Sequence, residues 1–177
     1  ARLHFLGVPI LYVPWFQFPI DNRRRTGLLF PTVGNSSRTG VDLRWPIYIN
    51  LAPNYDAQLI PRYMSRRGLQ LGSEFRYLMR QSRGSARVEH IANDEIYGDS
   101  RTYGEFAHEG RFSERLAIAA NYAEVSDREY FEDFGGNIDL SALTFLERRL
   151  QLTYNAPAAY TVGFLVQNYQ VIDPSVA

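Results

Sequence analysis

Apolar and polar residues alternate along residues 41–79, and the alternation keeps its phase through two reversals of the chain. Nearly every odd position in the runs 41–51, 55–63 and 69–79 is apolar or aromatic, whereas most even positions are polar or charged. A period of two is typical of β-strands with one apolar and one polar face. Each run has about ten residues and short turns join the runs, as in the wall of a membrane β-barrel.

The rest of the chain extends this pattern to nine candidate strands that follow an initial proline-rich segment. A change of phase within the last strand predicts a β-bulge near Gln167. The predicted strands span residues 27–34, 41–51, 55–64, 69–79, 85–91, 101–110, 115–125, 148–156 and 160–171.

The connections between these strands fall into two sets. Connections 52–54, 80–84, 111–114 and 157–159 are short, whereas the alternate set, 35–40, 65–68, 92–100 and 126–147, contains every long loop. Outer-membrane barrels have short periplasmic turns and longer outer loops. The sequence therefore predicts an all-β fold, namely antiparallel up-and-down strands that form part of a large outer-membrane β-barrel.

Composition narrows the classes of partner. The formal net charge is zero, and all 19 basic residues are arginine, so the basic field that nucleic acids require is absent. Cysteine is absent as well, which excludes a disulfide within these residues. The longest apolar stretch, residues 5–16, is too short for a transmembrane helix and contains two prolines. Because the chain begins without methionine, we expect a piece of a longer protein.

Catalytic and metal-binding motifs are absent from the sequence. His4, His90 and His108 lack ligand spacing, and the acidic loop 126–133 lacks the spacing of an EF-hand. Ser126 and Glu129 are instead spaced as a capping box that opens a helical turn. We therefore expect no enzyme, no cofactor and no metal site.

Two groups of arginines are candidate ligands for phosphates or sugars. Arg23, Arg24 and Arg25 precede the first predicted strand, where they form either an anion site or a solvated turn. Three further arginines share the polar face with carboxylates, which predicts a charge ladder across neighbouring strands or, if this face lines a lumen, contacts to sugars. These arginines are Arg44, Arg62 and Arg76, and the carboxylates are Asp42, Asp56 and Glu74.

Prolines interrupt the hydrogen-bonding capacity of the first strands. Pro31 and Pro46 are predicted to lie inside the first and second strands, and Pro61 inside the third. Proline has no N–H to donate, so it is normally confined to strand edges and bulges. The first two positions therefore predict a weak seam at the start of the sheet.

Several longer motifs occur in order along the chain, namely GVPILY at 7–12, RRRTG at 23–27, APNYDA at 52–57, PRYMSRRG at 61–68, EFRYL at 74–78 and VSD at 125–127. Together they resemble the LptD family, the lipopolysaccharide-assembly proteins of the Gram-negative outer membrane. The resemblance fades after about residue 140.

The resemblance implies a periplasmic jelly-roll followed by a barrel of about twenty-six strands. Residues 1–25 would be the end of the jelly-roll and a hinge, and residues 26–177 the first barrel strands. Pro31 and Pro46 match the lateral gate, through which lipopolysaccharide leaves the lumen for the membrane lipid. The implied partners are the lipoprotein LptE, which plugs the lumen, and the periplasmic protein LptA, which bridges to the jelly-roll.

Two alternatives to a translocon remain open from the residues alone. A passive porin-like or structural barrel has the same alternation and the same lumen charges, but it has no need for prolines in consecutive strands. A soluble carbohydrate-binding β-sandwich, with exposed aromatic residues stacked on sugars, is the second alternative.

Overall fold

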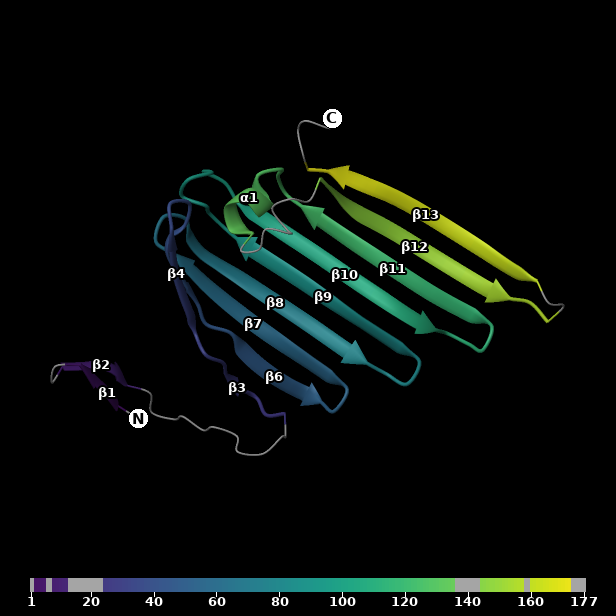
Figure 1. Cartoon of the computed structure of the whole chain (residues 1–177), viewed down its shortest axis with the longest axis horizontal. Helices are drawn as coiled ribbons and strands as arrows, with labels where there is room; N and C mark the ends of the chain where they lie inside the picture. The colour runs from purple at the N-terminus through teal and green to yellow at the C-terminus, as the bar shows by residue number, and fades with distance from the viewer. Residues whose placement is uncertain (1, 6–7, 13–23, 136–143, 158–159, 173–177) are drawn as a thin grey trace.

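The computed structural model describes residues 2–5, 8–12, 24–135, 144–157 and 160–172 of the 177-residue chain (Figure 1). These residues form one eleven-stranded antiparallel sheet, a separate two-stranded sheet and one short helix. The strands are β1 (Arg2–Phe5), β2 (Val8–Tyr12), β3 (Gly27–Leu28), β4 (Thr32–Ser36), β5 (Gly40–Arg44), β6 (Ile47–Ala52), β7 (Tyr55–Met64), β8 (Gly68–Leu78), β9 (Ser82–Ile91), β10 (Arg101–Arg111), β11 (Leu116–Val125), β12 (Phe145–Asn155) and β13 (Thr161–Val171), and the helix is α1 (Tyr130–Phe134).

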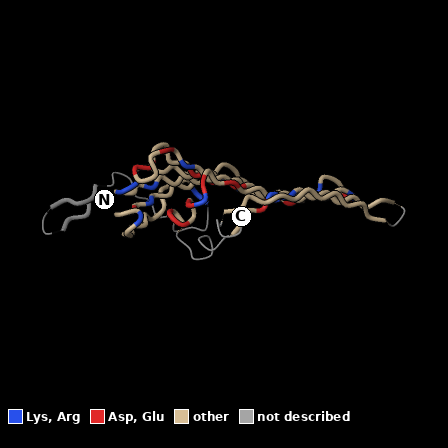
Figure 2. The backbone as a smooth tube through the Cα atoms, turned by 90° about the horizontal axis from the view of Figure 1, so that it is seen from above, with Lys and Arg blue, Asp and Glu red and all other residues tan. Residues whose placement is uncertain are grey.

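The large sheet has an up-and-down order that follows the sequence from β4 at one edge to β13 at the other. It does not close on itself within the described residues, so it is an open piece of wall (Figures 1 and 2). This confirms the predicted all-β antiparallel fold. The alternation also located β7 to β13 closely, because side-chain phase and strand length agree along each of them.

Prolines change the first two predicted strands. The segment 27–34 is divided into β3 and β4 around Pro31, and the segment 41–51 is divided into β5 and β6 around Pro46. The prediction that these prolines lie inside continuous strands was therefore wrong. The alternation of side chains continues across Pro46, whereas the pairing shifts by one residue across Pro31, from Leu28 with Ile47 to Val33 with Leu43. A residue without an N–H cannot continue the ladder.

The predicted bulge near Gln167 was also wrong. The pairing of β12 with β13 runs without a register shift from Asn155 and Thr161 to Phe145 and Val171. The change of phase arises because Tyr169 lies on the other face of the sheet, where its ring packs edge-on against Phe145 at 5.0 Å between centroids.

The register places the apolar residues of neighbouring strands on one face, which we call the apolar face. Its side chains are largely uncovered by the described chain, with Leu71 57% and Phe164 54% exposed. Water does not tolerate so large an apolar surface, whereas the hydrocarbon of a bilayer does. Other exposed members of this face are Leu59, Val88, Phe106, Leu150, Val162 and Val166.

The opposite side, which we call the polar face, carries most of the charged strand residues, and α1 lies against it. Helix α1 folds back from the connection between β11 and β12 and buries Tyr130, Phe131 and Phe134. These rings join the main buried cluster at the long-loop end of the sheet. The other members are Met64, Ile91, Tyr103, Val125, Leu146 and Ile172.

The predicted helical turn is confirmed, but the predicted capping box is wrong. The N-cap of α1 is Glu129, which makes no side-chain cap bond, and the Ser126 hydroxyl instead donates to Asp127 at 2.8 Å. The Asp127 carboxylate accepts the backbone N–H of Glu129 at 3.1 Å. Among the residues described, no helix is long and apolar enough to cross a bilayer.

Candidate functional site

The breaks in the first strands face each other at the edge of the sheet. The register pairs Leu28 with Ile47 on one side of the breaks and Thr32 with Arg44 on the other. Between these pairs, the N–H of Leu29 donates to the carbonyl of Pro46 at 2.8 Å. The structure thus brings Pro31 and Pro46 to adjoining positions.

Pro61 continues this row into the third strand. Its carbonyl accepts the N–H of Trp45 at 3.0 Å, so its backbone faces the break between β5 and β6. Because the N–H and C=O of a strand residue in an antiparallel ladder point to the same neighbour, the missing donor of Pro61 faces this break too. Three neighbouring strands therefore lack a donor along one line.

Arg62 is nearly covered, and its guanidinium is held by protein groups. Its Nη2 and Nε atoms donate to the two oxygens of Asp42 at 2.6 and 2.9 Å, and Nη1 donates to Gln70 at 3.2 Å and to the carbonyl of Phe134 at 3.3 Å. The side chain is 7% exposed. Arg62 therefore joins strand β7 to α1.

Arg24 and Arg76 share one carboxylate and keep more contact with solvent. Arg76 Nε lies 2.7 Å from Asp56, and Arg24 Nη1 lies 3.5 Å from the other oxygen of that carboxylate. Arg44 is also partly exposed, and its Nε lies 3.8 Å from Asp42. The predicted charge ladder is present on this part of the face.

The remaining predicted arginines precede the sheet. Arg25 is described and has an interaction partner of its own. Arg23 lies outside the described residues.

A buried ionic network at the long-loop end was not predicted from the sequence. Arg101 is 0% exposed and donates to Asp127 at 2.9 Å, to Asp133 at 2.6 Å and to Asp94 at 3.1 Å. Arg67 donates to Asp94 at 2.6 Å and pairs with Asp133 at 2.6 Å. The network joins the 65–67 turn, the 92–100 loop and the start of the 126–144 connection.

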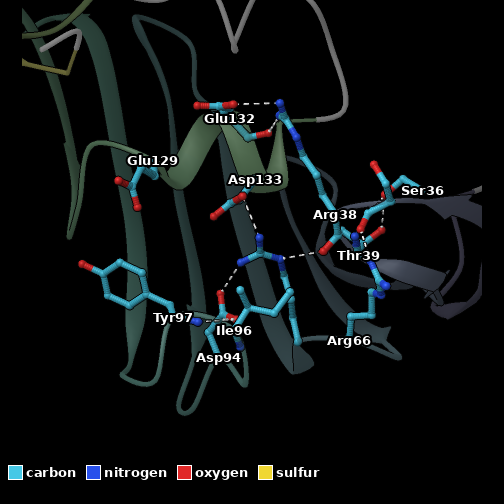
Figure 3. A network of polar contacts seen from close by, with 12 residues as sticks. Ser36, Arg38, Thr39, Arg66, Asp94, Ile96, Tyr97, Glu129, Glu132 and Asp133 are labelled. Carbon is cyan, nitrogen blue, oxygen red and sulfur yellow. Dashed lines mark hydrogen bonds and ion pairs between the residues drawn. The ribbon is translucent and has the colours of Figure 1, made fainter.

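The environment of Asp94 decides its charge. Burial alone would raise the pKa of its carboxyl group. Hydrogen bonds from the backbone N–H of Ile96 and from the side chains of Arg67 and Arg101 outweigh the effect of burial, so the pKa lies below its ordinary value. Figure 3 shows this carboxylate beside Ile96 and Tyr97. Asp94 is therefore ionised at neutral pH, with its charge matched by two guanidinium groups.

One aromatic ring adds to this network. The ring of Phe134 has the guanidinium carbons of Arg101, Arg67 and Arg62 at 4.8, 5.2 and 5.8 Å from its centroid. Guanidinium groups at such distances are attracted by the electron-rich ring face. Helix α1 is thus anchored by charge and by packing, and we call α1 with the Arg101 network the cap.

An exposed ion pair links the cap to the first hairpin. Arg38, in the turn between β4 and β5, pairs with Glu132 of α1 at 2.7 Å and also donates to the Glu132 carbonyl (Figure 3). The two side chains are 50% and 64% exposed. A movement of the hairpin away from the cap would have to break this pair.

These features define a class of protein. An antiparallel sheet with an uncovered apolar face, short turns at one end and folded loops at the other is part of the wall of an outer-membrane β-barrel. The described residues contain no group of three or more histidine, cysteine or acidic side chains arranged to hold a metal ion.

Comparison with known proteins specifies the family. Residues 99–177 match the family model LptD, described as LPS transport system D. Proteins named LPS-assembly protein LptD from Azoarcus sp. (strain BH72) and Thiobacillus denitrificans are each 41% identical to this chain, over 96% and 100% of it. The one from Xylella fastidiosa (strain Temecula1) is 42% identical over 95% of the chain.

The chain belongs to the LptD family, which confirms the resemblance found in its motifs. It spans only 21% to 24% of the length of these three relatives. Their names describe assembly of lipopolysaccharide (LPS), not an enzymatic reaction.

Proposed function

We propose that this chain forms part of the wall of a translocon that inserts LPS into the outer leaflet of the outer membrane. The polar face lines a lumen for the sugars, and the edge at β3 and β4 is one side of a lateral gate for the acyl chains. Residues 1–25 belong to the end of a periplasmic jelly-roll with its hinge, and residues 26–177 to the barrel. The partners are LPS, an LptE plug, an LptA bridge and membrane lipid.

The observation that carries this proposal is the row of Pro31, Pro46 and Pro61 at the edge of the sheet. Pairing along the first hairpin is reduced to two residue pairs between β3 and β6 and five between β4 and β5, whereas β12 and β13 share eleven. Each missing backbone hydrogen bond removes about 1 kcal/mol of stability in water, and an unpaired carbonyl in hydrocarbon costs more. The edge strands β3 and β4 therefore separate from the next strands more easily than β13 separates from β12.

A passive barrel is the competing function. Its wall needs alternating faces and lumen charges but no line of missing donors, because nothing has to leave through its side. The proline row therefore favours the translocon.

The direct test replaces Pro31 and Pro46 with alanine in the full-length protein. Two restored bonds of about 1 kcal/mol each would stabilise the pairing of β3 and β4 with β5 and β6 by about 30-fold, which stiffens the edge against opening. We expect slower delivery of newly made LPS to the cell surface and a more permeable outer membrane.

The matched control is Pro53→Ala, in the turn between β6 and β7 and outside the ladders. Delivery of LPS that is unchanged in the double variant would remove the gate from the proposal. Slower delivery in both variants would point to a general folding defect instead.

A further inference from the structure

Arg149 differs from most strand arginines of the polar face. It lies on β12, and no described carboxylate approaches its guanidinium within 4.0 Å. Arg111, at the end of β10, also lacks such a partner among the described residues. Six others have one, namely Arg44, Arg62, Arg76, Arg83, Arg87 and Arg101.

The guanidinium of Arg149 is only partly satisfied. Its Nη2 donates to the side-chain oxygen of Gln151 at 2.5 Å, whereas its Nε is buried and has no hydrogen-bond partner. A buried donor without a partner is costly and rare in folded proteins, so its presence needs a reason. If the side chain turns so that Nε becomes accessible, an oxyanion that accepts from Nε and a neighbouring Nη at once removes this cost, because guanidinium groups bind carboxylate and phosphate in that way.

The cross-strand neighbours of Arg149 are neutral and suited to sugars. The register places Asn121 of β11 and Gln167 of β13 directly across from it, and both side chains are exposed. Carboxamides both donate and accept, as hydroxyl groups require. Ala107 and Ala119 complete the surface on the β10 and β11 side without adding charge. The nearest acidic residue along β12, Glu147, accepts a hydrogen bond from Gln167.

From this arrangement we infer a subsite for an anionic saccharide on the polar face of β11–β13. Arg149 binds a phosphate or carboxylate group, while Asn121 and Gln167 bind neighbouring hydroxyls. The inference rests on the proposed function, since the saccharide is then the sugar portion of LPS as it passes through the lumen. It adds a position in the wall, on strand β12, that holds the charge of the substrate.

The test uses the full-length protein with a photo-crosslinking amino acid at Ala119, beside Arg149 on the same face, and purified LPS as the probe. We expect labelling that falls about tenfold in Arg149→Gln and by less in Arg149→Lys, because lysine keeps the charge but cannot make the paired contact of Nε and Nη. The matched control is Arg83→Gln, which removes an equal charge from the same face at an arginine already paired with Glu109. This control should leave the labelling unchanged.

Phosphatase-treated LPS separates the two sources of charge. Labelling that becomes independent of Arg149 after treatment assigns the site to phosphate, and labelling that stays dependent assigns it to carboxylate. Equal labelling of Arg149→Gln and the unsubstituted protein would overturn the subsite, as would an equal loss in Arg83→Gln.

A second pair of probes at Leu29 and Ile47 keeps the two proposals distinguishable. If these probes label LPS and the probe at Ala119 does not, the subsite fails while the translocon stands. If none of the three labels LPS while the protein resists protease as a folded barrel does, both proposals fail.

Discussion

The two ends of the sheet are stabilised in different ways. Around β7 to β10, the cap covers the polar face with buried ion pairs and aromatic rings, and the adjoining first hairpin is broken by prolines. Around β12 and β13, the backbone ladder is continuous over eleven pairs. The ladders of β7 with β8 and of β9 with β10 are continuous too, with ten pairs each. The two regions therefore differ in the broken first hairpin and in the cap, whose side-chain contacts position the loops.

This difference has a consequence for function. Side-chain contacts such as Arg38 with Glu132 can break and reform singly, whereas a continuous ladder opens only with the loss of many bonds. A wall that must open at one edge and stay closed elsewhere needs this division. The unpaired Arg149 lies in the continuous region, where binding a substrate does not require the wall to move.

The largest expected effect comes from removing the centre of the cap. Arg101→Met removes a fully buried guanidinium that pairs with Asp94, Asp127 and Asp133, which costs about 3–5 kcal/mol. We expect the 92–100 and 126–144 connections to become sensitive to protease in the purified full-length protein, while β12 and β13 stay protected.

The control for this change is Arg83→Met, which removes an exposed partner of Glu109 and costs less than about 1 kcal/mol. If both variants showed the same protease sensitivity, the cap would not depend on the buried network.

Acid should loosen the same region selectively. Asp94 has a folded-state pKa below its unfolded value, so its contribution is fully present above the unfolded value of about 3.9 and is lost as the pH falls through the folded-state pKa. We expect the 92–100 loop to become protease-sensitive at low pH, measured with an acid-active protease. In Asp94→Asn the 92–100 loop should be protease-sensitive already at neutral pH. If the loop of that variant resisted protease as well as the loop of the unsubstituted protein, the Asp94 carboxylate would not hold the loop in place.

Hydrogen exchange compares the two regions directly. The few remaining amides of the β3–β6 hairpin should exchange about tenfold or more faster than those at the centre of β12, because fewer neighbouring bonds must open together. Mass spectrometry of the full-length protein in detergent measures both segments in one experiment. Equal protection of the two segments would mean that the prolines do not weaken the edge.

The smallest effect is expected at the link between hairpin and cap. Arg38→Ala removes an exposed ion pair worth about 0.2–1 kcal/mol, so stability should change little. Exchange in the β4–β5 turn should nevertheless accelerate, because its only described ion pair to α1 is lost. Glu132→Gln should reproduce the effect. If exchange in the turn changed in neither variant, the ion pair would not hold the hairpin to the cap.

Side-chain alternation predicted most of the fold because each strand shows one face to apolar surroundings. The bounds of β7 were predicted to the residue, and those of β8, β10 and β11 nearly so. Alternation carries no information on backbone donors, so the breaks at Pro31 and Pro46 were taken for strand interiors.

The sites were less predictable than the strands. Arg67, Asp94 and Arg101 come from different connections, and only the folded register brings their charges together. Arg62 was grouped with Arg44 and Arg76 because all three share a face, but α1 covers Arg62 alone. Arg149 was missed because it is distinguished by the lack of a carboxylate partner on β11 and β13. Finding this requires knowing which strands are neighbours.

The measurement that tests the central claim most directly is photo-crosslinking in living cells, from Leu29 and Ile47 of the full-length protein, with detection of LPS. Leu152, on the apolar face of the continuous strand β12, is the control position. The account predicts a crosslink to LPS at the first two positions that depends on active transport, and none at Leu152. Equal crosslinking of LPS from all three positions would contradict a gate at this edge. The absence of LPS crosslinks at all three, with Leu29 crosslinked only to a neighbouring strand, would contradict it as well.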